Sequence, residues 1–172
     1  DKGATLKFLR AKHKEYTQVC KEEAYNRLYI GKENFLVCDQ VYAQDREKVE
    51  LFDLLQLDPE KGCVYLYHVK SGFGQPTREA CAQIRIAAQN LRADIEKSCE
   101  LLGRLYDNCM RESTSRFREK VKEDIQAFSK RGDKEGKEGW IDFFQSYLTK
   151  RGSMVFVYAF VDKGSPERRL EE

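Results

Sequence analysis

Residues 64–95 read VYLYHVKSGFGQPTREACAQIRIAAQNLRADI, and the organisation of the whole chain can be built outward from this stretch. Its first seven residues alternate as a β-strand does, so that His68 and Lys70 share one face and Val69 points to the other. After a short glycine-containing turn, apolar residues recur at helical spacing at Ala80, Ile84, Ala88, Leu91 and Ile95. The pattern therefore predicts a strand that leads into a long helix.

Strand-like patterns occur on both sides of this unit. Before it lie residues 27–30, 34–42 and 49–55, and a hairpin turn at 31–33 joins the first two. After it, residues 154–161 are apolar on both faces, which is typical of a central strand that is buried on both sides. We therefore expect three or four strands before the long helix and one strand after it.

Helical patterns account for most of the remaining chain, at residues 4–28, 97–111, 115–129 and 140–148. A charged, glycine-containing loop at 131–139 is the best candidate for a mobile segment. This order predicts an α/β fold with a central mixed sheet flanked by helices, in which residues 97–150 form a helical insertion. We expect one domain over 1–163 and a disordered tail over 164–172. Because the chain begins without methionine, we also expect it to be part of a larger protein.

Composition excludes several classes of protein. The 172 residues include 31 basic and 29 acidic side chains, a balance that argues against a surface that is basic throughout. None of the six cysteines forms a C-x-x-C pair, and there are only two histidines, so we do not expect a structural zinc site. Because the cysteines fall inside predicted helices and strands and not in loops, we expect reduced thiols in an intracellular protein, cytoplasmic or nuclear. No apolar run is long enough to span a membrane.

Four side chains on neighbouring predicted strands can carry chemistry. Glu50 and Asp53 belong to one strand, and His68 and Lys70 belong to the next. If the two strands are neighbours, these groups converge at one end of the sheet, where carboxylate and imidazole could hold a divalent metal and lysine could stabilise negative charge. Hydrolysis of a phosphodiester needs these groups. The alternative is structural, with His68 a hydrogen-bonded residue at a strand end and Lys70 extending to water.

The order of Asp53 on one strand, then His68–Val69–Lys70 on the next, then a long helix, resembles the restriction-endonuclease-like PD-(D/E)XK nuclease superfamily. The resemblance implies a restriction-endonuclease-like core that binds magnesium and activates water. Asp53 matches the family's aspartate, His68 its second acidic position and Lys70 its lysine. Residues 4–28, with Glu22 and Glu23, would take the place of the family's first helix.

A second resemblance, covering residues 25–95, is to an uncharacterised, sporadically distributed microbial family thought to share this fold. Its pattern is matched by VELFDLL at residues 49–55, by HVK at 68–70 and by Ala82–Gln83. This likeness implies that Gln83 supports the site from the helix.

His68 departs from the nuclease pattern, because magnesium prefers hard oxygen ligands and imidazole suits manganese or a softer ion better. We therefore expect Mg²⁺ or Mn²⁺ held by Asp53, Glu50 and His68, with Glu50 or Glu22 able to supply the missing carboxylate.

Nucleic-acid contacts are predicted on the long helix. Arg78, Arg85 and Arg92 recur every seven residues on one face and could follow phosphates, and Ser71 at the strand end joins them. A solvated helix face is the alternative. Gly72 and Gly74 could also cradle a phosphate, but a plain strand-to-helix turn explains them as well.

The leading functional prediction is a nucleic-acid-binding, metal-dependent nuclease domain with Asp53, His68, Lys70 and Gln83 in its catalytic site. DNA is the favoured partner, alongside other domains of a larger protein, and a homodimer is left open. The resemblance implies a setting in defence or repair. The alternative is a catalytically inactive module of the same fold that binds protein or nucleic acid.

Overall fold

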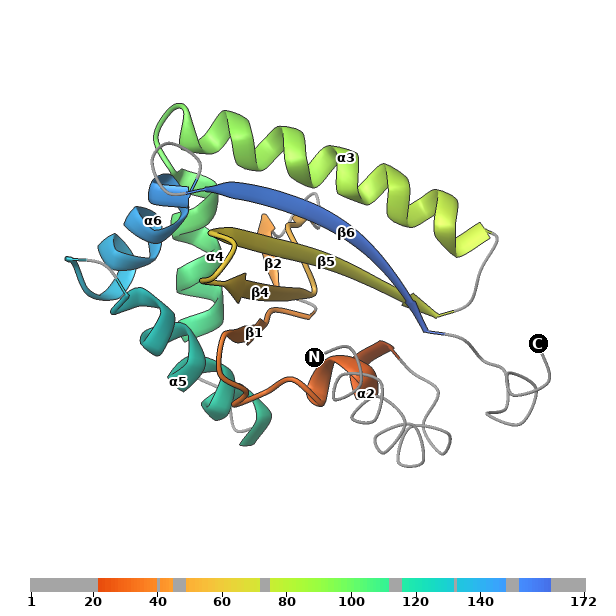
Figure 1. The fold of residues 1–172 in the computed structure, drawn as a ribbon, viewed down its shortest axis with the longest axis horizontal. Coiled ribbons are helices and arrows are strands. Elements are labelled where there is room, and N and C mark those ends of the chain that lie inside the picture. Colours follow the sequence, from red (N-terminus) through yellow and green to blue (C-terminus); the bar gives the residue numbers. More distant parts are fainter. Residues whose placement is uncertain are drawn as a thin grey trace.

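The computed structural model describes residues 22–39, 41–44, 49–71, 75–111, 116–131, 133–147 and 152–161. Within these residues, four strands form one mixed sheet against which helices pack (Figure 1). The spatial order of the strands is β1 (Phe35–Val37), β4 (Leu54–Asp58), β5 (Cys63–Ser71) and β6 (Ser153–Val161). The predicted α/β class with a mixed sheet is therefore confirmed.

The strand directions follow from the connections. The short strands β1 and β4 are antiparallel, β4 and β5 form an antiparallel hairpin, and β6 runs parallel to β5. Asp58 closes the hairpin by accepting a 3.1 Å hydrogen bond from the Lys61 N–H, and Gly62 takes the positive φ of 62° that the turn needs. The helix α3 (Gln75–Ile95) follows β5 and confirms the strand-to-helix unit predicted at 64–95.

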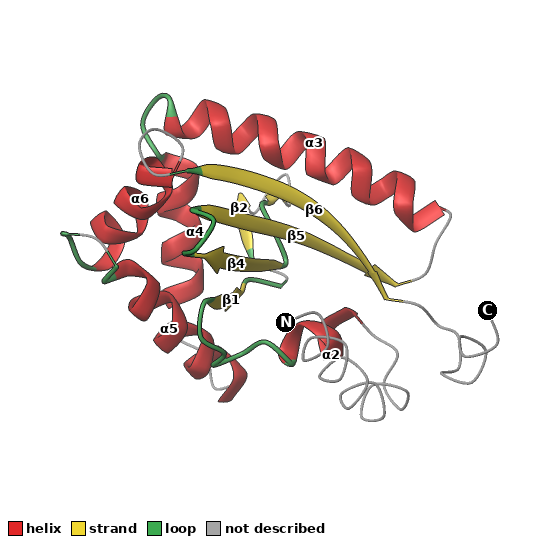
Figure 2. Cartoon of the chain, viewed as in Figure 1, coloured by secondary structure: helices red, strands yellow, loops and turns green. Residues whose placement is uncertain are grey.

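The main core lies on the sheet face that carries Leu55, Val64 and Leu66. Four helices cover this face (Figure 2). They are α3, α4 (Glu100–Met110), α5 (Arg116–Ser129) and α6 (Gly136–Ser146). Residues 97–150 are thus largely helical where they are described, and they complete the main core through side chains such as Leu102 and Trp140, which are fully buried.

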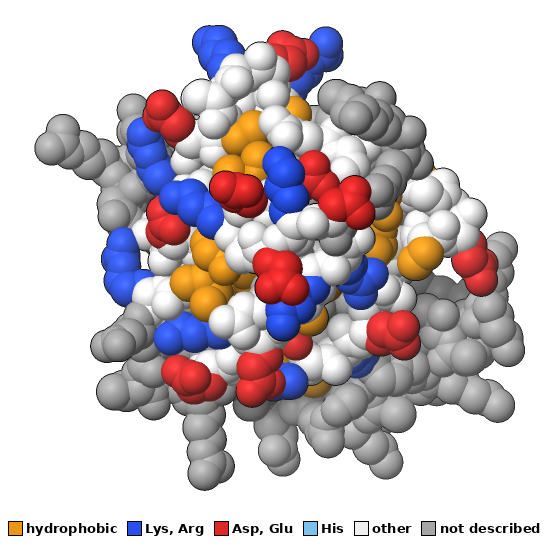
Figure 3. All heavy atoms as spheres, turned by 90° about the vertical axis from the view of Figure 1, so that its left-hand side faces the viewer, with side chains coloured by type: hydrophobic (Ala, Val, Ile, Leu, Met, Phe, Trp, Pro, Cys, Tyr) orange, Lys and Arg blue, Asp and Glu red, His pale blue; other side chains and the backbone are white. Residues whose placement is uncertain are grey.

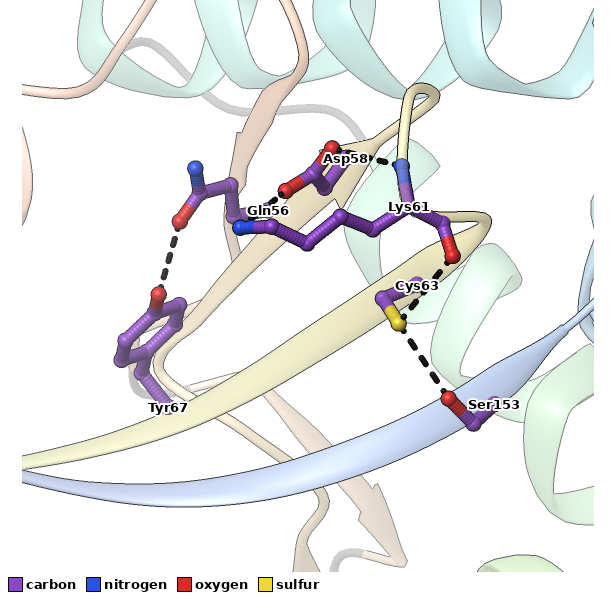
Figure 4. A network of polar contacts seen from close by, with 6 residues as sticks. All are labelled: Gln56, Asp58, Lys61, Cys63, Tyr67 and Ser153. Carbon is purple, nitrogen blue, oxygen red and sulfur yellow. Dashed lines mark hydrogen bonds and ion pairs between the residues drawn. The ribbon is translucent and has the colours of Figure 1, made fainter. Parts of the chain in front are cut away.

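The opposite face of the sheet has a smaller apolar cluster and a polar part. Val37, Leu54 and Val69 pack there against tyrosines of the α2 region (Glu22–Arg27 and the turns after it). Further along the same face, polar side chains interact across the strands (Figure 4). The Tyr67 hydroxyl donates to Gln56 at 2.7 Å, Lys61 pairs with Asp58 at 3.1 Å, and Cys63 contacts Ser153 at 3.2 Å.

A separate two-stranded ribbon lies beside the main sheet. It pairs β2 (Tyr42–Gln44) with β3 (Val49–Glu50) in antiparallel fashion, so that Tyr42 is opposite Glu50. The Asn108 side chain on α4 donates a 2.6 Å hydrogen bond to the Tyr42 carbonyl. Helix α4 therefore fixes the ribbon that carries Glu50.

Three predicted strands near the N-terminal end are wrong in detail. Residues 34–42 are not one strand: Phe35–Val37 forms β1, a turn from Cys38 to Val41 follows, and Tyr42 begins β2. Residues 27–30 are not a strand: α2 ends at Arg27, and helix-like turns follow because the Leu28 N–H bonds to the Tyr25 carbonyl at 3.1 Å. The predicted strand at 49–55 is two strands, β3 and β4, with residues 51–53 between them. Of the predicted helix 4–28, residues 4–21 lie outside the described part of the chain.

Two predictions near the C-terminal end also need correction. Residues 154–161 do form a strand, but β6 lies at the edge of the sheet and not at its centre. The predicted loop at 131–139 is shorter, because α6 already begins at Gly136. No described helix is both long and apolar enough to cross a membrane.

Candidate metal and catalytic site

Three carboxylates meet where the chain leaves β1 and returns to β4. They belong to Asp39, Glu50 and Asp53, and one ligand oxygen from each lies within 4.8 Å of the others. Asp39 follows β1, Glu50 ends β3, and Asp53 precedes β4. This acidic cluster could hold a metal ion.

Backbone hydrogen bonds hold the segments of the cluster together. The Cys38 N–H donates to the Asp53 carbonyl at 2.8 Å, which extends the pairing of β1 with β4 beyond the strand ends. A turn from Cys38 to Val41, closed by a 3.0 Å hydrogen bond, contains Asp39. The Asp53 N–H donates to the Tyr67 carbonyl at 2.8 Å, so the cluster is also tied to β5.

Asp53 is the most buried member of the acidic cluster, with 2% of its surface exposed. Its Oδ2 atom accepts a 2.5 Å hydrogen bond from the Val69 N–H. Burial, followed by the negative charge of Glu50, raises the pKa of Asp53 to about 8, although the Val69 hydrogen bond and the Lys70 charge oppose the shift. Asp53 therefore tends to hold a proton at neutral pH.

Lys70 is the cation beside these carboxylates. Its Nζ atom lies 3.6 Å from Oε2 of Glu22 on α2, and its side chain is largely buried. Burial lowers the pKa of Lys70, but the negative charges of Asp53, Glu22 and Glu50 outweigh that effect and raise it above its ordinary value. Lys70 therefore stays protonated at neutral pH and faces the acidic cluster.

His68 is fully buried, and neither ring nitrogen has a hydrogen-bond partner in the described part of the chain. Burial and then the Lys70 charge lower the pKa of His68 to about 4. The backbone of Leu51 acts in the opposite direction and raises the pKa of His68, although its contact with the ring does not have the geometry of an ordinary hydrogen bond. His68, predicted as a metal ligand, is not a member of the acidic cluster, whereas Glu50 and Asp53 are.

The remaining predicted residues lie on or next to α3. Gln83 is half-buried, and its Oε1 atom lacks a hydrogen-bond partner among the described residues. Arg78, Arg85 and Arg92 are exposed on the outside of α3, and Arg92 pairs with Glu96 at 3.0 Å. Ser71 is the last residue of β5, and the loop with Gly72 and Gly74 lies outside the described residues.

Asp39 is the site residue that sequence reasoning missed. It lies two residues after the apolar strand Phe35–Val37, and the only sequence signal is an acidic residue within the predicted strand 34–42. Its proximity to Asp53 depends on the antiparallel register that sets Val37 opposite Leu54. The alternation of residue types along the sequence does not specify which residues of the two strands lie opposite each other.

The acidic cluster offers only oxygen ligands to a metal ion. Its three donors are carboxylates, and it contains no thiolate or imidazole. Fold and site together define a mixed α/β domain with a carboxylate cluster and a neighbouring lysine. When the chain is compared with known family models, curated proteins and solved structures, none matches.

Proposed function

We propose that the chain is a metal-dependent phosphodiester hydrolase that acts on nucleic acid, a nuclease with a restriction-endonuclease-like core. One observation carries the proposal: Asp39, Glu50 and Asp53 converge within 4.8 Å, with the protonated Lys70 beside them. Carboxylates for a divalent ion and a cation near the reacting phosphate are the groups that this hydrolysis needs.

The carboxylates would hold Mg²⁺ or Mn²⁺ through oxygen atoms of Asp39, Glu50 and Asp53. A divalent ion bound there supplies Lewis acidity and makes water more acidic. The Val69 N–H fixes the Asp53 carboxylate by its hydrogen bond to Oδ2, so that ligand has little freedom to move. The position of Asp53 is therefore set before an ion arrives.

Lys70 would stabilise the negative charge that develops on the phosphate. Glu22 holds its ammonium group at 3.6 Å, which orients the side chain at the end of β5. Because its pKa is raised, Lys70 acts as a positive charge and as a hydrogen-bond donor, and not as a base. Deprotonation of the attacking water would fall to a carboxylate or to bulk solvent.

Exposed arginines on α3 support a nucleic-acid substrate, and we favour DNA. Arg78 and Arg85 are exposed on this helix, which follows directly after the strand that carries Lys70. On the described part of the face formed by α4, α5 and α6, acidic and basic side chains are interspersed (Figure 3). We expect the substrate to approach from the side of α2, β5 and the start of α3.

A second candidate function is a non-catalytic binding module of the same fold. It is favoured by the full burial of His68 at the position where the nuclease resemblance expects an acidic residue. In that case Lys70 and Glu22 form a structural ion pair, and the acidic cluster holds protons instead of a metal.

Cleavage of plasmid DNA, single-stranded DNA and RNA with Mg²⁺ or Mn²⁺ tests the proposal. Asp53→Asn and Lys70→Ala should each abolish cutting. The matched controls Asp58→Asn and Lys61→Ala break an exposed ion pair at the β4–β5 hairpin and should leave cutting intact. Absence of cleavage by folded wild-type protein with either metal would reject the nuclease and leave the binding module.

A further inference from the structure

The strand β6 lies at an edge of the described sheet, and its own sequence carries none of the features that usually protect such an edge. It spans nine residues, Ser153–Val161, with the sequence SMVFVYAFV, which contains no charged residue and no proline. Among the described strands it pairs only with β5. Natural edge strands are usually short or carry lysine, proline or a bulge, because their unpaired N–H and C=O groups attract other strands. At the opposite edge, β1 has only three residues.

The large apolar side chains that are exposed among the described residues belong to β6 and to the helix next to it. Two large hydrophobic residues are exposed in the described part of the chain, Val155 at 37% and Ile86 at 49%. Val155 belongs to β6 and Ile86 to α3, the helix that runs beside β6 (Figure 2). Val155 points to the sheet face opposite α3, because its neighbours Met154 and Phe156 pack toward the main core that α3 covers. The β6 edge surface, formed by β6 and the exposed side of α3, therefore carries one large exposed apolar side chain on each face of the sheet.

We propose that this surface joins two copies of the chain, with β6 of one copy pairing antiparallel to β6 of the other. The two four-stranded sheets would then form one continuous sheet around a two-fold axis. A strand of nine residues spans about 30 Å, long enough for a ladder of backbone hydrogen bonds. Because β6 carries no charge, no like charges oppose each other across the axis. A two-fold interface needs such a self-complementary surface.

The charges on α3 favour a second copy over a foreign peptide. A two-fold axis perpendicular to the sheet sets the two α3 helices side by side on the same face and antiparallel. The exposed Arg78 lies near the N-terminal end of α3, and the exposed Glu96 lies just beyond its C-terminal end. In the antiparallel arrangement, Arg78 of one copy would approach Glu96 of the other. Ile86 lies near the middle of α3, where the two helices would meet. This interface is independent of the proposed nuclease activity.

The molar mass in solution, measured by light scattering or sedimentation at increasing concentration, tests the proposal. The wild-type chain should reach about twice its monomer mass of 20.1 kDa. Val155→Lys and Ile86→Glu should each shift it to the monomer with an unchanged circular dichroism spectrum. Ala127→Lys, at an exposed position on α5, is the matched control and should remain a dimer.

Hydrogen exchange of the wild-type protein gives a second readout that does not depend on the variants folding. Backbone N–H groups of β6 should become more protected as concentration rises, while those of α5 should not change. A monomer at every concentration would overturn the proposal, as would a dimer that survives both Val155→Lys and Ile86→Glu. A dimer without added protection in β6 would place the interface elsewhere and would also overturn it.

Discussion

Replacing His68 by leucine should make the protein less sensitive to acid without unfolding it at neutral pH. The folded-state pKa of His68 is about 4, against an ordinary value of 6.5, because the ring is buried beside Lys70. The unfolded state therefore binds a proton first as pH falls, and stability is lost between pH 6.5 and pH 4. From pH 7 to pH 5 this linkage amounts to about 2 kcal/mol.

Urea unfolding at pH 7 and pH 5, followed through the fluorescence of the single tryptophan, Trp140, measures the effect. Wild type should lose about 2 kcal/mol more than His68→Leu on this acidification. At pH 7 the variant should lie within about 1 kcal/mol of wild type, because it removes two buried nitrogens that lack partners. The matched control is His13→Leu, which leaves His68 in place. Equal acid losses in wild type and His68→Leu would refute the reasoning.

Three further predictions concern the site and the core. Because the pKa of Asp53 is about 8, Mn²⁺ binding below that pH should release a proton, and the affinity for Mn²⁺ should rise about 50-fold from pH 6 to pH 8. Calorimetry in two buffers measures the proton release and the affinity, and binding without proton release would contradict this prediction. Lys70→Met should abolish cleavage while leaving Mn²⁺ bound, since the lysine is not a ligand; loss of Mn²⁺ binding in a folded variant would argue against the assignment. Trp140→Ala should cost about 4 kcal/mol in urea unfolding followed by circular dichroism, because the indole is fully buried and donates to the Leu102 carbonyl at 3.0 Å. A loss below about 1 kcal/mol would contradict the observed packing.

The sequence predicted best the parts of the fold with strong local patterns. The unit of β5 and α3 follows from strict alternation over 64–70 and an apolar stripe on the helix. The β6 strand was also recognised, but its position was wrong. Its two faces are both apolar because Met154 and Phe156 pack toward the main core while Ala159 contacts the smaller cluster on the other face. Burial on two faces thus gave the same signal as a central position.

The candidate site was predicted only in part, because local patterns place some of its residues and long-range contacts place the others. Period-two geometry set Lys70 at the strand end, and the hairpin of β4 and β5 brings Asp53 to it. Asp39 escaped prediction because its place depends on long-range strand register and on the turn after β1. Glu22, named from the resemblance as an alternative carboxylate, lies at Lys70, but the described cluster does not include it.

The balance of charge links the two candidate functions to one measurement. Among the described residues, the carboxylates of Glu22, Glu50 and Asp53 act on the ammonium group of Lys70, and Asp39 joins Glu50 and Asp53 in the acidic cluster. The cluster has an excess of negative charge that either a proton or a metal ion must offset. The pKa of Asp53 is raised by burial first and by the charge of Glu50 second, so Asp53 holds the proton when no metal is bound. A nuclease exchanges that proton for a divalent ion, whereas a module that keeps the cluster only for its fold does not. Proton-coupled Mn²⁺ binding therefore separates the two functions even before a substrate is known.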